Sequence, residues 1–183
     1  MRHTLLLSTA ILVAVGVTAA SAADDKNALI KDALSAAPPE IAKTAMVMDW
    51  DHSMLKNGSG PYTCMPSDPN TRAKGGRNPM CVDKVWEAWV DAYVNKKPFK
   101  ATDVGIAYML AGDTGASNID PYATTATPTN QWVVEGPHLM VIAPDAAQLE
   151  GLSTDPNNGG AYVMWKGTPY AHIMVPVADH PKQ

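Results

Sequence analysis

The sequence predicts a single α+β domain with a mainly antiparallel sheet and two or three helices, preceded by an export signal. Three observations carry this prediction. One segment has strong helical periodicity, several short apolar segments alternate as strands do, and thirteen glycines and fifteen prolines supply many turns. Because several of these strands follow one another without a helix between them, we expect antiparallel rather than parallel pairing.

The first 22 residues contain the three parts of a secretory signal peptide. Arg2 supplies the positive charge, residues 5–17 supply an apolar stretch, and Ala20-Ser21-Ala22 forms a small-residue cleavage motif. We expect cleavage between Ala22 and Ala23, so that residues 23–183 form the domain and the product is periplasmic or secreted. The alternative is an uncleaved anchor, which needs about 20 apolar residues. We expect no membrane span after cleavage.

The charge of the chain argues against nucleic acid as its partner. Without Arg2, thirteen basic side chains remain against eighteen acidic ones, and no basic cluster is present. A mildly acidic chain of this kind is a poor nucleic-acid binder. We therefore expect a metal ion or a small molecule as the partner.

The two cysteines, Cys64 and Cys81, both lie in the exported part of the chain. An even pair in an oxidising compartment indicates a disulfide. Ligation of a metal by the two thiolates is the alternative.

The first half of the predicted domain contains the clearest helix. Residues 25–36 suit a short amphipathic helix that Pro38-Pro39 ends, and residues 45–51 alternate as a strand. From Pro79 to Asn95, apolar residues recur at steps of three and four, with charged residues between them. The apolar positions of this helix are Val82, Val85, Trp86, Trp89, Val90 and Tyr93.

The second half is richer in strands. Residues 104–110 form a buried strand, and a long polar loop follows over 111–130. Residues 131–143 hold one or two strands interrupted at Gly136-Pro137, and residues 145–152 form a short helix capped by Asp145. Residues 161–166 and 169–177 form a hairpin around Gly167-Thr168.

Two of the predicted strands carry the same motif, His-x-Met. Residues two apart on a strand point to the same face, so His138 projects with Met140 and His172 with Met174. If the two strands are neighbours, these four side chains converge. Imidazole and thioether together favour copper, Cu(I) above all. The paired motif resembles that of periplasmic copper chaperones of the His/Met-binding cupredoxin-like kind, and the resemblance implies a copper site.

Two other functions compete with copper binding. Asp49 and Asp51 lie together at a strand end and could serve His138 or His172 as acid/base partners in a small-molecule hydrolase or another enzyme. Alternatively, the methionines fill the core and the histidines are structural, in a non-catalytic envelope protein. No phosphate loop, dinucleotide fingerprint or nucleophile elbow is present. The sequence therefore favours a binding protein over an enzyme.

Four stretches also resemble a group of exported bacterial proteins that carry no assigned function. The resemblance implies export and a single domain, and it transfers no catalytic residue or cofactor. The stretches are NIDPYAT (118–124), WVVEGPHLMVI (132–142), DPNNGG (155–160) and VMWKGTPYAHIMVPV (163–177).

Overall fold

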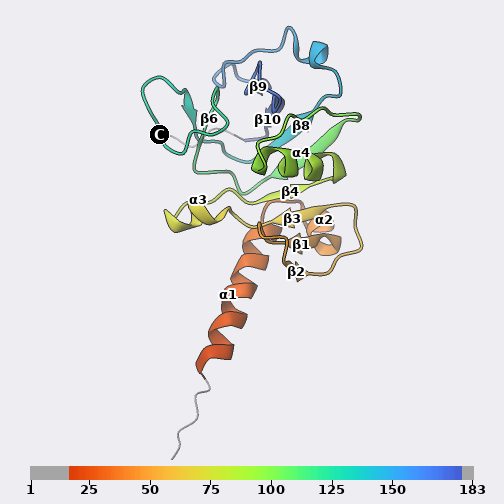
Figure 1. The fold of residues 1–183 in the computed structure, drawn as a ribbon, viewed down its shortest axis with the longest axis vertical. Coiled ribbons are helices and arrows are strands. Elements are labelled where there is room, and N and C mark those ends of the chain that lie inside the picture. The colour runs from red at the N-terminus through yellow and green to blue at the C-terminus, as the bar shows by residue number, and fades with distance from the viewer. Residues whose placement is uncertain (1–16, 179–183) are drawn as a thin grey trace, which may run out of the picture.

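The computed structural model describes residues 17–178, and nearly all of its strands belong to one sheet. The strands are β1 (Met46–Met48), β2 (Met54–Lys56), β3 (Thr63–Met65), β4 (Met80–Val82), β5 (Gly105–Met109), β6 (Ala116–Ser117), β7 (Trp132–Val133), β8 (His138–Ile142), β9 (Tyr162–Met164) and β10 (His172–Pro176). The eight-stranded sheet has the order β2-β1-β3-β4-β5-β8-β10-β9, and β6 pairs with β7 separately (Figure 1).

All neighbours in the large sheet are antiparallel except β1 and β3, which are parallel. The described part of the chain contains four α-helices and one 3-10 helix. They are α1 (Val17–Leu34), α2 (Pro39–Thr44), α3 (Pro69–Ala73), α4 (Lys84–Val94) and the 3-10 helix Ala146–Leu149. The predicted α+β class with a mainly antiparallel sheet is therefore confirmed.

The helices α1 and α4 cover opposite faces of the sheet. Cys64 and Cys81 pack in one cluster with Ala33 of α1. Their strand neighbours Met65 and Val82 pack in a second cluster with the α4 tryptophans. Because successive strand residues point to opposite faces, the two clusters lie on the two sides of the sheet. Below, the side that carries the second cluster is called the α4 face.

The helix α4 begins later than the sequence predicts. Residues 80–82 form β4 rather than the first turn of the helix. Asp83 then caps the helix by accepting a hydrogen bond from the Trp86 amide at 3.0 Å, and it also accepts one from the Ile106 amide at 2.6 Å. Gly105 lets the helix approach closely, because a Cβ there would lie 3.0 Å from Trp86 Cδ1.

The helix α1 begins at Val17, eight residues before the predicted start, and it passes through the predicted cleavage position. Most of it extends away from the sheet, and its C-terminal end lies against β1 to β4 (Figure 1). Residues 1–16 lie outside the described residues, so the export signal stays a prediction. Within residues 17–178, no helix combines the length and the apolar character needed to cross a bilayer.

Most of the elements after α4 agree with the predictions made from the sequence. Residues 131–143 form two strands, Asp145 caps the 3-10 helix, and β9 pairs with β10 as the predicted hairpin. Trp86 and Trp89 are buried core residues. The strands β2 and β3 have only three residues each, too few for alternation to reveal them.

Cys64 and Cys81 lie directly opposite each other on β3 and β4 and form the predicted disulfide, with 3.9 Å between their Cα atoms. Both are fully buried on the α1 side of the sheet. The bond closes the loop that contains α3, a segment without a buried helical residue of its own.

We predict that removing this bond lowers the free energy of unfolding by about 3 kcal/mol, the value that loop-closure entropy gives for a loop of this size. Urea unfolding of the Cys64→Ala/Cys81→Ala protein measures the loss. Wild-type protein treated with a reductant is the control and should lose a similar amount. An unchanged urea midpoint in both would contradict the prediction.

Candidate functional site

The two His-x-Met motifs lie on neighbouring antiparallel strands, β8 and β10. Met140 and Met174 are directly opposite each other in the register. The motif side chains His138, Met140, His172 and Met174 are all buried. Both methionines belong to the cluster under α4, so the four side chains project from the α4 face.

The antiparallel register places the two histidines on opposite sides of the methionine pair. His138 is opposite Pro176, and the same register continued by one residue places His172 opposite Ile142. Their Cα atoms are therefore about 13 Å apart along the strand direction. The motifs are adjacent, but the two imidazoles do not lie side by side.

Each histidine instead has a further methionine as its partner on the next strand. Met109 of β5 is opposite His138, and Met164 of β9 is opposite His172. Cβ atoms of directly opposite residues are about 5 Å apart. Each histidine thus has two methionines as neighbours in the sheet, one from its own motif and one from the neighbouring strand. The sequence motif revealed only the first of these.

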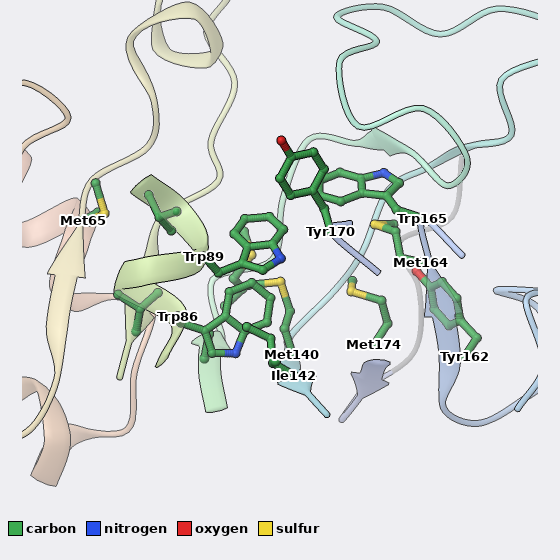
Figure 2. Packing of buried hydrophobic residues seen from close by; sticks show 14 residues of the cluster. Met65, Trp86, Trp89, Met140, Ile142, Tyr162, Met164, Trp165, Tyr170 and Met174 are labelled. Carbon is green, nitrogen blue, oxygen red and sulfur yellow. The ribbon is translucent and has the colours of Figure 1, made fainter. Parts of the chain in front are cut away.

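The thioethers form one layer with the aromatic side chains of the core. Figure 2 shows Met140, Met164 and Met174 gathered near the indoles of Trp86, Trp89 and Trp165. Met109 belongs to the same cluster.

Hydrogen bonds determine which ring nitrogen of each histidine is protonated. His138 Nδ1 lies 2.7 Å from the Gly136 carbonyl oxygen, and His172 Nδ1 lies 2.9 Å from that of Tyr170. Because a carbonyl only accepts, Nδ1 carries the hydrogen, and in the neutral ring Nε2 carries a lone pair. Both Nε2 atoms are buried and have no hydrogen-bond partner among the described residues. Metal-binding histidines typically have this arrangement.

Aromatic rings surround His172. Its ring centroid lies 5.3 Å from that of Trp86, 5.7 Å from that of Trp89 and 5.2 Å from that of Trp165, each edge to face. Burial lowers the pKa of His172 to about 4, although its hydrogen bond to the Tyr170 carbonyl acts the other way. The imidazole is therefore neutral at physiological pH.

Acidic side chains lie near His138, and sequence reasoning missed them. The Asp113 carboxylate accepts hydrogen bonds from the amides of Gly115 at 2.9 Å and Glu135 at 3.1 Å. Burial raises the pKa of Asp113, and its electrostatic interaction with His138 acts the other way. The buried Glu135 accepts a hydrogen bond from the Tyr162 hydroxyl, and burial raises the Tyr162 pKa. The buried acidic side chains of Asp113 and Glu135 therefore belong to the surroundings of His138, and burial favours the neutral form of Asp113.

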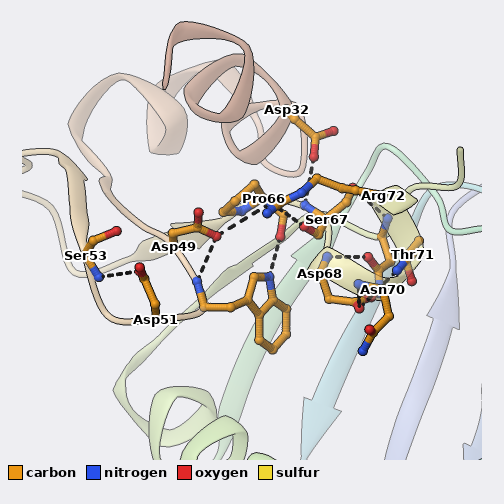
Figure 3. Close-up of polar contacts among 12 residues, drawn as sticks. Asp32, Asp49, Asp51, Ser53, Pro66, Ser67, Asp68, Asn70, Thr71 and Arg72 are labelled. Carbon is orange, nitrogen blue, oxygen red and sulfur yellow. Dashed lines mark hydrogen bonds and ion pairs between the residues drawn. The ribbon is translucent and has the colours of Figure 1, made fainter. Parts of the chain in front are cut away.

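Asp49 and Asp51 lie far from both histidines. Asp49 forms an ion pair with Arg72 at 3.6 Å, and Asp51 accepts a hydrogen bond from the Ser53 amide at 2.9 Å (Figure 3). These acids follow β1, which is four strand spacings from β8, or about 19 Å. The structure does not bring them within hydrogen-bond distance of an imidazole.

No family model matches the chain, and neither a curated protein nor a solved structure matches it. Within residues 17–178, no group of three or more His, Cys, Asp or Glu side chains is placed to hold a metal ion.

The lowered pKa of His172 predicts a pH-dependent stability. Between pH 6.5 and pH 4 the unfolded chain binds the proton and the folded chain does not, so the free energy of unfolding falls as the pH falls. The contribution lost over this window is about 3 kcal/mol.

Urea unfolding at pH 7 and pH 4.5 of wild type and His172→Gln measures this contribution. The fall in the free energy of unfolding from pH 7 to pH 4.5 should be smaller in the variant, because its glutamine side chain does not titrate. An equal fall in the free energy of unfolding in the two proteins would contradict the attribution of this pH dependence to His172.

Proposed function

We propose that this protein is exported and binds Cu(I) through its two His-x-Met motifs, His138/Met140 and His172/Met174. The observation that carries the proposal is the state of the imidazoles. Each has Nδ1 bonded to a backbone carbonyl, a buried Nε2 without a described hydrogen-bond partner, and two methionines beside it.

The donor set suits a soft cation. One imidazole with two thioethers matches Cu(I), whereas hard cations such as Ca²⁺ or Mg²⁺ require oxygen ligands. The set beside His138 consists of Met140 and Met109, and the set beside His172 consists of Met174 and Met164. Both lie in one water-poor layer, where two cations would repel strongly, so we expect one Cu(I) per chain in this core.

The disulfide supports the proposed location. Disulfides persist in oxidising compartments such as the periplasm. Thioethers suit such a compartment, because they do not form disulfides and so remain available as ligands. The signal-like segment over residues 1–22 supports the same location.

Metal analysis of protein purified from the periplasm of copper-supplied cells tests the proposal. We expect core-bound copper in the wild type and its loss in His138→Gln/His172→Gln. The double variant Met109→Leu/Met164→Leu keeps both imidazoles and nearly the same core volume, and it should weaken Cu(I) binding at least tenfold. Met46→Leu, on β1, is the matched control.

Near-ultraviolet circular dichroism of the buried tryptophans reports whether each variant is folded. The proposal would be refuted if the histidine double variant and the methionine double variant both fold and both bind Cu(I) with the wild-type affinity.

The neutral state of His172 makes a second prediction about binding. In the His138→Gln background, affinity for Ag(I), a redox-inert substitute for Cu(I), should change less than twofold between pH 8 and pH 5, because protons do not compete above the pKa of about 4. A ligand histidine with an ordinary pKa would lose about thirtyfold over this range. Competition titrations with a chelator of known affinity, followed by the fluorescence of the tryptophans around His172, distinguish the two outcomes.

A further inference from the structure

A small cavity lies between the turn that follows β1 and the helix α4. Its volume is about 50 Å³. This is room for an ion or a water or two, whereas pockets for organic ligands hold several hundred Å³. The lining includes Met48, Met65 and His52, together with the acidic side chains Glu87 and Asp91. The cavity therefore has room for a small ion but not for an organic ligand.

The side chains around the cavity favour a soft cation. Met48 and Met65 offer thioethers and His52 offers an imidazole, which again is a set for Cu(I) or Ag(I). The two carboxylates give the cavity a negative potential, which attracts cations. A hydrogen bond from the Thr63 hydroxyl holds Glu87 in place.

The turn holds His52 in an unusual backbone conformation. Its φ is 65°, in the left-handed region that residues other than glycine seldom adopt. The His52 amide donates to the Asp49 carbonyl at 3.0 Å, and the Ser53 amide donates to Asp51 (Figure 3). Conformations of this kind occur preferentially at binding sites.

A row of methionines connects the cavity to His138. In the register, Met54 is opposite Met48, Met65 is opposite Met80, and Met109 is opposite His138. The registers of β1 with β3 and of β4 with β5, each continued by one residue, place Met48 beside Met65 and Met80 beside Met109. The methionine row is thus Met54, Met48, Met65, Met80 and Met109, on five neighbouring strands.

The two ends of the row differ in exposure, and Met80 within it is partly exposed. Met54 is 54% exposed, Met65 is 5% exposed, and His138 is fully buried. Neighbouring strands are about 4.8 Å apart, so each thioether lies within reach of the next. The row therefore leads from solvent at the sheet edge to the imidazole proposed above as a copper ligand.

We propose that the cavity is a surface acceptor site for Cu(I), with Met48, Met65 and His52 as ligands, and that the methionine row passes the ion to the core. In each step one sulfur–metal bond forms as another breaks, and the oxidation state of the metal does not change. The acceptor site stands on its own geometry, whereas the passage to His138 rests on the proposed function.

Titration with Ag(I) of protein labelled with ¹³C in the methionine methyl groups tests the acceptor site. We expect two Ag(I) per wild-type chain, with the methyl signals of Met48 and Met65 shifting on binding. Met48→Leu/Met65→Leu should bind one fewer ion than wild type. Met46→Leu, from the same strand but outside the cavity lining, is the control.

The histidine variants separate this inference from the proposed function. His138→Gln/His172→Gln should keep the surface ion and lose the core ion. If it keeps both ions while Met48→Leu/Met65→Leu loses one, the proposed function fails and the acceptor site stands. If Met48→Leu/Met65→Leu binds Ag(I) with wild-type stoichiometry and affinity, the acceptor site is refuted.

The passage is tested by the rate at which the core fills. A Trp50→Phe background removes the tryptophan in the cavity lining, so that tryptophan fluorescence in a stopped-flow experiment follows Ag(I) reaching the layer that contains Trp86 and Trp89. Met80→Leu interrupts the methionine row between Met65 and Met109 and should slow this phase at least tenfold relative to Met46→Leu. Equal rates in the two variants would overturn the passage.

Discussion

The register between β8 and β10 is the constraint on which the candidate site depends. Because side chains alternate along a strand, a slip of one residue would turn both His-x-Met motifs away from the core. The pairing is held from both sides, by β5 against β8 and by β9 against β10. The same register places a methionine opposite each histidine, so a single backbone arrangement produces both histidine–methionine groups.

The two ends of this buried layer differ in their electrostatics. His172 lies among indole rings, and burial alone is enough to keep it neutral. His138 lies near Asp113, whose carboxylate is held by two backbone amides. The two histidines therefore share one buried layer but differ in their neighbours, which are aromatic rings at His172 and a buried acidic side chain at His138.

Local patterns predicted the elements that have strong periodicity. The alternation of β8 and β10, the hairpin turn and the amphipathic stripe of α4 were all readable, because their side chains repeat on the period of the structure they form. The predicted start of α4 was wrong. Residues 80–82 pair with β3 and β5, and this pairing overrides a helical pattern that continues through them. The short strands β2 and β3 carry too few residues for any period.

By itself, the sequence determined the fold class, the disulfide partners and the two His-x-Met motifs with their side chains on one face of each strand. Those properties follow from composition and from short-range periodicity. Only the tertiary structure decided that the histidines lie on opposite sides of the Met140–Met174 pair, that Met109 and Met164 stand beside them, and that Asp49 and Asp51 lie elsewhere. The reason is that strand order and register are set by contacts between segments far apart in the chain, which no local pattern encodes.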